Sequence, residues 1–390
     1  MRSADLEKGK NMKKFLNIIC LLLIACMTLS ACGGTPVETE TNAETEKETE
    51  AKTETEEVTT VKTYTLAEAK PYVRVFGRSK MAGDSLICDW NGCGIEMALD
   101  CEGDVELTYT YSGNEGQYIS VFLDDMPYCD IPCLSGTRTV KIAERLEKGF
   151  HIIRVITQFA QKKATFDKLR FDGSMIKLSQ SDAYVEIIGD SITCGAFLSP
   201  EGSDYFTAGY AYIAMKKLDA DYAVCARGGM PLSVPTTIND TYPFFNKNRD
   251  NTPYTPERKA DLIIVNLGTN DNWQWYKQAN NKLDHETFNY ANFDAGMETF
   301  IKNLDKIHGE KQVPIVFVFG CTTVDTRKVA TDRMQELIND VYIPAGYDIQ
   351  MAFLPNNRSG KDGHPDAAGA QKQGEALAEY LKTNYPEIFG

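Results

Sequence analysis

The stretch Ile187-Ile188-Gly189-Asp190-Ser191-Ile192-Thr193-Cys194-Gly195 decides the fold of the second half of the chain. An apolar run that starts at Tyr184 leads into Gly-Asp-Ser and then into a turn of small residues. This pattern is typical of a buried parallel strand that ends at the carboxyl edge of an open α/β sheet, where such sheets place their chemistry. We therefore expect Ser191 to stand at the start of a helix, where the helix dipole and its own N–H favour negative charge.

Three further blocks supply the partners that a nucleophilic serine needs. Apolar runs precede both Ala226-Arg227-Gly228-Gly229 and Gly268-Thr269-Asn270-Asp271, and Asp362-Gly363-His364-Pro365 stands before an amphipathic segment near the C-terminus. Serine, glycine, asparagine and histidine in strand-end loops can form a nucleophile, two oxyanion donors and a base.

These four blocks, in this order, resemble the SGNH, or GDSL, hydrolase superfamily over roughly residues 182–388. The resemblance implies a flavodoxin-like, doubly wound sheet and an ester hydrolase that needs no metal or cofactor. It assigns Ser191 as nucleophile, His364 as general base and Asn270 as side-chain oxyanion donor. The backbone N–H groups of Ser191 and Gly228 would complete the oxyanion hole, although Arg227 or Gly229 could supply the second amide instead.

The third catalytic member departs from the usual superfamily pattern. Most SGNH enzymes have an aspartate three residues before the histidine, but that position is Lys361 here, and the nearest aspartate is Asp362. The Asp-x-His-Pro segment resembles family 2 carbohydrate esterases, some of which orient the histidine through a backbone carbonyl. Asp362 is therefore the expected orienting residue, with the carbonyl of Gly363 or another group as the alternative.

Residues 62–178 are expected to form an antiparallel β-sandwich of the jelly-roll type. Short alternating segments are separated by Gly, Asn and Asp turns, with little helical periodicity. The expected strands lie near residues 72–76, 94–99, 105–109, 118–123 and 151–155. The fragments Gly77-Arg78, Trp90-Asn91-Gly92 and Leu123-Asp124-Asp125 resemble the N-terminal domain of family 2 carbohydrate esterases.

Residues 182–390 change to alternating strands and helices, which predicts a parallel sheet with helices on both faces. Strands are expected near 184–188, 221–225, 261–267, 314–320 and 347–353, and helices over 208–218, 289–308, 331–341 and 366–383.

The amino terminus predicts export and a lipid anchor. Basic residues precede a short apolar run, which suits a signal peptide of residues 1–31 better than a membrane span. The ending Leu29-Ser30-Ala31-Cys32 resembles the bacterial lipobox, which implies cleavage before Cys32 and a diacylglycerol on its sulfur. A plain secretory signal is the alternative. The expected product is a bacterial surface lipoprotein held at the membrane.

Residues 32–61 read as a Thr/Glu-rich disordered tether, because they lack the apolar surface that offsets ordering entropy. Nine Glu and two Lys within residues 38–57 contribute half of the net charge of −14, which argues against nucleic-acid binding. Eight cysteines remain after Cys32. An exported chain permits disulfides, and we expect no more than one or two, within residues 88–133.

The resemblance implies a carbohydrate O-acetyl esterase acting on acetylated xylan or a related polysaccharide. Trp273, Trp275 and Tyr276 follow the asparagine block, and we expect at least one of them, with the two tryptophans as the candidates, to contact sugar. Packing in the core or at a hinge is the alternative. One alternative is an SGNH esterase that acts on another ester, such as O-acetylated peptidoglycan or a lipid-like ester. The other is a glycan-binding lipoprotein without catalysis.

Overall fold

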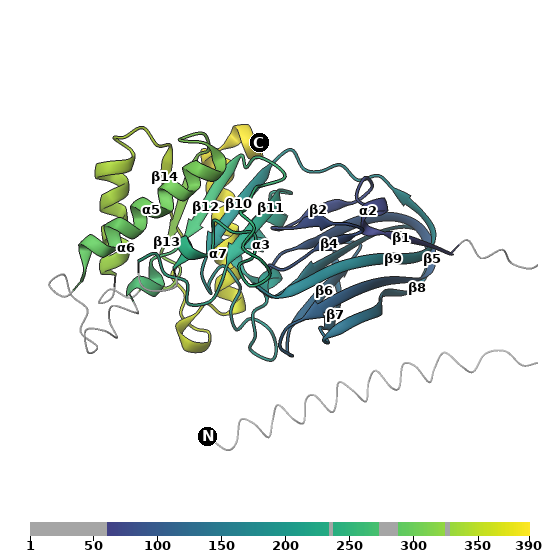
Figure 1. Ribbon diagram of the computed structural model, residues 1–390. Helices are drawn as coiled ribbons and strands as arrows, with labels where there is room; N and C mark the ends of the chain where they lie inside the picture. Colours follow the sequence, from purple (N-terminus) through teal and green to yellow (C-terminus); the bar gives the residue numbers. More distant parts are fainter. Residues whose placement is uncertain (1–60, 234–236, 273–287, 324–327) are drawn as a thin grey trace, which may run out of the picture. The chain divides into compact units, whose positions relative to one another are not determined.

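The computed structural model describes residues 61–390 apart from 234–236, 273–287 and 324–327. Cys32 and the rest of the expected tether up to residue 60 lie outside the described residues, whereas Val61 begins the first strand. Residues 58–390 form one compact unit, which contains an antiparallel sheet followed by a parallel one (Figure 1). None of the helices in the described part is long and apolar enough to cross a bilayer.

The first sheet is antiparallel, as expected, and within the described residues it has nine strands in the order β3-β4-β9-β5-β8-β6-β7, with β1 on β9 and β2 on β5. The strands are β1 (Val61–Thr65), β2 (Arg74–Phe76), β3 (Lys80–Ala82), β4 (Ser85–Ile87), β5 (Gly94–Ser112), β6 (Tyr118–Leu123), β7 (Met126–Pro132), β8 (Gly136–Thr157) and β9 (Lys163–Ile176). The short helix α2 (Leu66–Ala69) follows β1. The jelly-roll topology and the domain boundaries remain predictions.

One strand of this sheet, β5, is much longer than its sequence pattern indicates. The expected segments 94–99 and 105–109 are both parts of β5, because the ladder continues through irregular register between Cys101 and Glu106. Bulges of this kind shift the alternation of side chains between the two faces of a sheet. A continuous strand therefore reads as two separate ones in the sequence.

The second sheet is parallel throughout, with the order β11-β10-β12-β13-β14. Its strands are β10 (Tyr184–Gly189), β11 (Asp221–Ala226), β12 (Leu262–Asn266), β13 (Ile315–Phe319) and β14 (Ile349–Phe353). Each lies within two residues of its predicted position. The chain reverses its direction of winding at β10, so Ser191 follows the strand at the topological switch point, where such sheets bind ligands.

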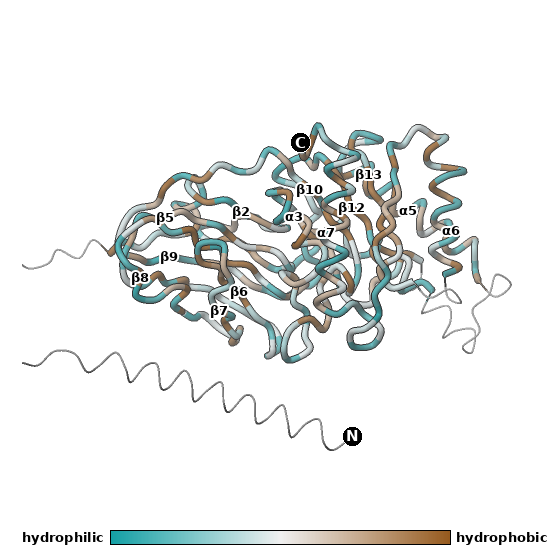
Figure 2. Tube along the Cα trace, turned by 180° about the vertical axis from the view of Figure 1, so that it is seen from behind, coloured by the Kyte–Doolittle hydropathy of each residue, from teal (hydrophilic) through white to brown (hydrophobic). Residues whose placement is uncertain are grey.

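Helices cover both faces of the parallel sheet, and strand residues point alternately to one face or the other. Ile187 and Val224 pack with α3 (Tyr210–Lys217) and α7 (Ala367–Asn384), whereas Ile188 and Val265 pack with α5 (Tyr290–His308) and α6 (Val329–Leu337). Figure 2 shows hydrophobic stretches along the strands between these helices. The remaining elements are the 3₁₀ turns η1 (Phe206–Ala208), η2 (Ile238–Asp240) and η5 (Lys361–Gly363), the π-helical turn η4 (Ile338–Tyr342) and α8 (Pro386–Phe389).

The two sheets are joined by buried contacts that involve the motif fragments Gly77-Arg78 and Trp90-Asn91-Gly92. The Gly77 amide donates to the Tyr222 carbonyl at 2.7 Å, and the Trp90 indole N–H donates to the Phe245 carbonyl at 2.7 Å. The fully buried Arg78 guanidinium donates to the carbonyls of Tyr242 and Phe244, each at 2.6 Å.

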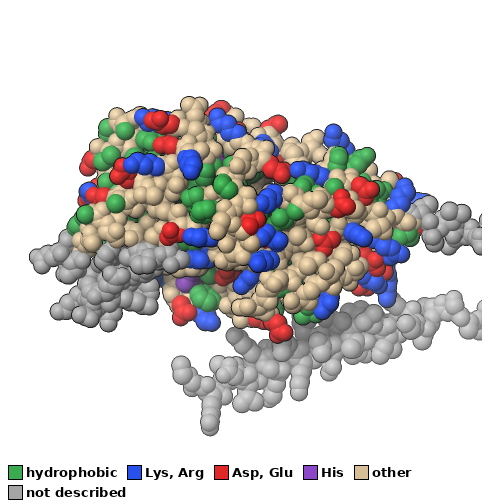
Figure 3. All heavy atoms as spheres, in the orientation of Figure 1, with side chains coloured by type: hydrophobic (Ala, Val, Ile, Leu, Met, Phe, Trp, Pro, Cys, Tyr) green, Lys and Arg blue, Asp and Glu red, His purple; other side chains and the backbone are tan. Residues whose placement is uncertain are grey.

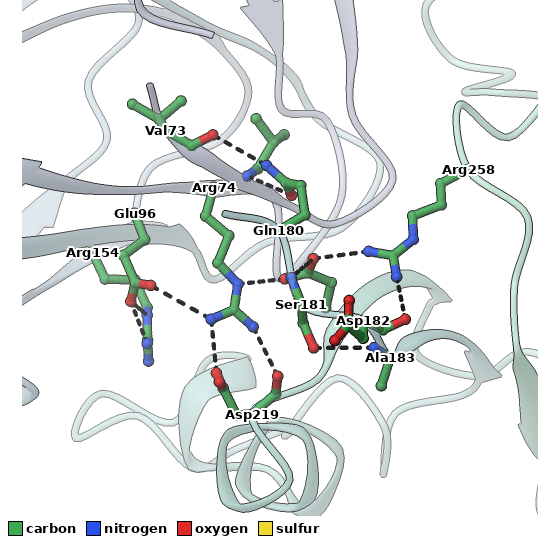
Figure 4. Close-up of polar contacts among 12 residues, drawn as sticks. Val73, Arg74, Glu96, Arg154, Gln180, Ser181, Asp182, Ala183, Asp219 and Arg258 are labelled. Carbon is green, nitrogen blue, oxygen red and sulfur yellow. Dashed lines mark hydrogen bonds and ion pairs between the residues drawn. The ribbon is translucent and has the colours of Figure 1, made fainter. Parts of the chain in front are cut away.

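A second contact is an ion-pair network around Arg74 on β2 (Figure 4). Arg74 pairs with Asp221 at 2.5 Å and with Asp219 at 2.7 Å, both beside the start of β11. Arg258 reaches Asp221 from the other side at 3.0 Å, while Arg154 on β8 pairs with Glu96 on β5. Three cationic and three anionic side chains therefore converge at the boundary between the two sheets.

The eight cysteines of the described region are all free thiols, and seven are buried. The expected upper limit was one or two disulfides within residues 88–133, and no disulfide forms among the described residues. These side chains act as small apolar groups in the cores of both sheets, a common role for buried cysteine.

Candidate active site

Ser191 lies two residues beyond the end of β10, in a series of turns. Its position depends on Gly189, because a Cβ atom there would lie 2.1 Å from Thr193 Oγ1. The Asp190 carboxylate accepts the Ile192 amide at 2.9 Å, and the Ser191 carbonyl accepts the Ala196 amide at 3.0 Å. The expected helix after Ser191 is absent, since residues 191–197 form turns instead.

His364 lies beside Ser191 although the two are 173 positions apart in the sequence. The distance from Ser191 Oγ to His364 Nε2 is 2.8 Å, and both side chains are half-buried. The edge of the imidazole meets the Phe197 ring at 5.0 Å between centroids. In the neutral tautomer that carries its proton on Nδ1, the Nε2 atom can accept the serine proton.

The other imidazole nitrogen meets a backbone carbonyl instead of the expected carboxylate. His364 Nδ1 lies 3.2 Å from the Lys361 carbonyl oxygen, and no hydrogen bond joins the ring to the Asp362 side chain. Asp362 has φ of +54° within η5, and its side chain is exposed. The structure thus differs from the expectation for Asp362 and for Gly363, because the turn brings the carbonyl of Lys361 to the ring.

The environment of His364 favours the neutral base. Partial burial lowers the pKa of His364, and the Lys361 carbonyl and the negative charge of Asp362 oppose this effect without cancelling it. A histidine with a lowered pKa is unprotonated over a wider range of pH, as a general base must be.

Two backbone N–H groups, those of Ser191 and Gly228, are candidate oxyanion donors. The amides of Ser191 and Gly228 have no acceptor among the described residues. The Arg227 amide is occupied, since it donates to the Gly189 carbonyl at 3.3 Å. A Cβ atom on Gly228 would lie 3.9 Å from Ser191 Cβ, whereas nothing lies within 4 Å of one on Gly229. The geometry therefore favours Gly228 as the second backbone donor.

Asn270 follows β12 in a helical turn, and its amide group is held by Asp190. Asn270 Nδ2 donates to Asp190 Oδ2 at 2.8 Å and makes a longer contact of 3.3 Å with the Met230 carbonyl. Desolvation raises the pKa of the fully buried Asp190 to about 7. The short bond fixes the amide at the cavity wall, and the N–H in the longer contact is the one that a developing oxyanion could attract.

Asp271 braces the loop that follows the glycine block, a role that the sequence pattern did not predict. Its buried carboxylate accepts the amides of Leu232 and Ser233, each at 2.9 Å, and the Ser233 hydroxyl at 2.6 Å. Burial raises the pKa of Asp271 to about 6. Both acidic side chains of the two strand-end blocks thus position backbone around Ser191.

The antiparallel sheet also shapes the site. Residues 195–209 carry Phe197 to the imidazole, and the Tyr205 hydroxyl in this segment donates to the Asp130 carboxylate on β7 at 2.8 Å. Arg227, next to Gly228, donates to the Gln161 side chain at 3.1 Å. The first sheet therefore supports two walls of the active site.

A cavity of about 1060 Å³ opens in front of these groups. Its walls include Ser191, Gly228, Asn270 and His364. The walls also include several residues that the sequence analysis did not predict to be in the site, namely Phe197, Asp204, Phe319, Phe353 and Arg358. In the sequence, the only signal that these five residues line the cavity is their position, either after an expected strand or near one of the four blocks. Trp273, Trp275 and Tyr276 lie outside the described residues.

Comparisons with known proteins agree with this geometry. Residues 187–372 match the model of the GDSL-like Lipase/Acylhydrolase family. No curated protein sequence matches the chain. Several solved structures share its fold at low identity.

An acetyl xylan esterase from the rumen bacterium Butyrivibrio proteoclasticus has a TM-score of 0.72 at 18% identity, covering 83% of this chain and 99% of that one. A family two carbohydrate esterase from Clostridium thermocellum, in complex with cellohexaose, has a TM-score of 0.70 at 19% identity, covering 80% and 99%. A family two carbohydrate esterase from Cellvibrio japonicus has a TM-score of 0.68 at 19% identity, covering 83% and 97%. The resemblance of this chain to the SGNH, or GDSL, hydrolases is therefore confirmed, and its fold is that of the family 2 carbohydrate esterases.

Proposed function

We propose that this protein is a serine esterase that removes O-acetyl groups from a polysaccharide, with acetylated xylan or a related hemicellulose as its substrate. The observation that carries the chemistry is the 2.8 Å contact between Ser191 Oγ and His364 Nε2, beside the unpaired amides of Ser191 and Gly228. The matches to family 2 carbohydrate esterases support the carbohydrate substrate.

In the first half of the reaction, Ser191 Oγ attacks the acetyl carbonyl carbon while His364 Nε2 takes the hydroxyl proton. The carbonyl oxygen becomes an oxyanion, which accepts hydrogen bonds from the Ser191 and Gly228 amides and from Asn270. When the intermediate collapses, the bond to the sugar oxygen breaks. His364 returns the proton to that oxygen, leaving a free sugar hydroxyl and an acetyl ester on Ser191.

In the second half, water attacks the acetyl-enzyme and His364 takes a proton from it. Collapse of this second intermediate releases acetate, and the proton returns to Ser191 Oγ. The Lys361 carbonyl accepts from Nδ1–H throughout both halves, so it keeps the ring in the required tautomer and orientation.

The test is acetate release from acetylated xylan and from a small aryl acetate, with wild type and Ser191→Ala. We expect wild type to release acetate from both substrates and the variant from neither. Release from the aryl acetate alone would support the serine esterase mechanism but exclude acetylated xylan as the substrate. O-acetylated peptidoglycan would then be the next polymer to test. Absence of serine-dependent release from both would overturn the proposal in favour of a glycan-binding protein without catalysis.

The cavity volume makes esters with longer acyl chains a second class of candidate substrate. A volume of about 1060 Å³ is large for an acetyl group, so an ester with a longer acyl chain is the second candidate substrate. Aryl esters of increasing chain length separate the two, because an acetyl esterase should lose activity steeply beyond two or three carbons. Retained activity on long chains would favour a lipid-like ester.

We also propose that the mature protein is exported and anchored through a lipid on Cys32, as the Leu-Ser-Ala-Cys sequence indicates. Two or three acyl chains hold a protein stably at a membrane, whereas a single chain does not. Wild type expressed in a bacterium should incorporate labelled palmitate and sediment with membranes. Cys32→Ala should do neither, and unchanged sedimentation of this variant would contradict the proposal.

A further inference from the structure

Two side chains in the cavity wall have no part in the proposed reaction. Phe353 ends β14 and Arg358 follows it in the connection to His364. Phe353 is 62% exposed, yet its inner face stacks on the buried Phe319 ring at 5.6 Å between centroids and 26° between planes. Phe319 thus holds the Phe353 ring in a fixed orientation at the cavity wall, as a rigid apolar platform.

Arg358 is a cation without an anionic partner in the described part of the chain. Lys328, the other cation among the described residues of the cavity wall, pairs with Asp332 at 3.0 Å. Asp362, four residues after Arg358 and also in the wall, forms no ion pair with it. On the face drawn in Figure 3, basic and acidic side chains are intermixed.

The turn before His364 makes room for this guanidinium. A Cβ atom on Gly363 would lie 2.9 Å from Arg358 Nη2, and Gly363 has φ of +77°. The positive φ favours glycine at this position, whereas the end of the flexible Arg358 side chain could move to admit a Cβ atom. The guanidinium consequently lies next to the residue that precedes the catalytic base.

An exposed aromatic ring and a guanidinium without an anionic partner among the described residues, both in the lining of one cavity, are suited to a particular ligand. The apolar C–H face of a sugar ring packs on an aromatic face, and a guanidinium binds a carboxylate through two parallel hydrogen bonds. A cavity of about 1060 Å³ is at the upper end of the volumes that bind drug-sized ligands, so it can hold a second sugar beside the one that bears the ester.

We propose that Phe353 and Arg358 form a distal subsite that binds a carboxylate-bearing sugar, a uronic acid residue, of the acetylated polysaccharide. This inference rests on the proposed function and names the class of polysaccharide: an acidic one is preferred over a neutral one. The uronic acid ring lies against Phe353 and its carboxylate accepts from Arg358, while the ester on a nearby sugar reaches Ser191.

The experiment compares acetylated glucuronoxylan before and after enzymatic removal of its uronic acid groups, with kcat/KM for acetate release as the readout. We expect wild type to prefer the uronate-bearing polymer roughly tenfold, the size of one charge-assisted contact. Arg358→Gln should abolish the preference, and 1 M salt should reduce it in wild type because salt screens the charge. Phe353→Ala should lower kcat/KM on the uronate-bearing polymer roughly three- to tenfold.

Two matched controls lie on β8, outside the cavity. Arg138 and Phe150 are both exposed, and Arg138→Gln and Phe150→Ala should leave the preference unchanged. The two control variants should hydrolyse the aryl acetate at the wild-type rate, and all four variants should unfold at the wild-type temperature, which shows that each is folded.

Three results would overturn the inference: equal rates of wild type on the two polymers, a preference that survives Arg358→Gln, or a loss in the control variants equal to that in Arg358→Gln. Failure of the proposed function has a different signature, namely that Ser191 dependence is absent for acetate release from both polymers.

Discussion

The carbonyl of Lys361, rather than a carboxylate, orients the imidazole of His364 at 3.2 Å. This assignment predicts that Asp362→Asn lowers kcat/KM on an aryl acetate less than about tenfold, because the carbonyl remains in place. Removing the carboxylate of a true triad costs about 10⁴-fold in kcat. A loss of that size in Asp362→Asn would restore Asp362 as the orienting residue, and Ser191→Ala gives the reference for complete loss.

The same residues predict the pH dependence of the reaction. The base must be neutral, and burial lowers the pKa of His364, so activity should fall only below the usual histidine pKa of about 6.5. The negative charge of Asp362 raises the pKa of His364. Asp362→Asn should therefore move the acid limb of the kcat/KM profile to still lower pH. A shift to higher pH would contradict this electrostatic assignment.

Asn270 should contribute to the transition state more than to substrate binding. Asn270→Ala is expected to reduce kcat about 10²- to 10³-fold with little change in KM, as for other side-chain oxyanion donors. Asn384→Ala is the matched control, because Asn384 is exposed at the end of α7 and bonds only the Tyr380 carbonyl in the described structure. A rise in KM without a fall in kcat would show that Asn270 binds the ground state instead.

The sequence identifies Ser191, Asn270 and His364 because each is a particular side chain in a block at a strand end. The orienting group could not be read in this way, since every residue has a carbonyl and only the turn at Asp362, with φ of +54°, decides which one reaches the ring. The position of Gly228 was open among three residues for the same reason. The hydrogen bond that occupies the Arg227 amide is a property of the fold.

At the level of elements, the turn after β10 depends on the absence of a side chain at Gly189. A methyl group there would overlap Thr193, whose hydroxyl lies 3.0 Å from the Tyr210 hydroxyl. Gly189→Ala should destabilise the protein by about 1–3 kcal/mol and lower kcat, because the overlap displaces the Ser191 turn. Thermal unfolding and aryl acetate hydrolysis measure the two effects.

Gly149→Ala on β8 is the control for Gly189→Ala, since a Cβ atom at Gly149 meets nothing within 4 Å. Equal effects of the two substitutions would show that the overlap with Thr193 is unimportant.

Most elements of the parallel sheet could be predicted because a buried parallel strand is a short apolar run between turn residues. The antiparallel sheet was less predictable. β7 and β9 carry many polar residues on their exposed sides, as in Lys163–Ile176, and did not stand out as strands. The irregular register within β5 disguised one long strand as two.

At the level of the whole molecule, the ion pairs around Arg74 predict that the two sheets unfold together. Arg74→Met should leave a buried Asp221 with only part of its partners and lower the free energy of unfolding by about 3 kcal/mol. Lys70→Met removes an exposed pair with Glu257 and should cost less than about 1 kcal/mol. Chemical denaturation followed by fluorescence checks both variants.

Wild type and Arg74→Met should each show a single transition. Two separated transitions in the wild type would mean that the sheets are independent domains. The sequence could not indicate this coupling, because Arg74 and its partners Asp219 and Asp221 are about 145 positions apart and charged residues occur throughout the chain.

The eight free thiols have a consequence for how the protein matures and ages. Desolvation raises the pKa of every one of them, so the thiolate that reacts with oxidants is scarce at neutral pH. Folding of the described region therefore needs no enzyme that forms or rearranges disulfides. The buried thiols also react slowly in thiol–disulfide exchange. Such an enzyme can keep its shape in surroundings without oxygen as readily as in air.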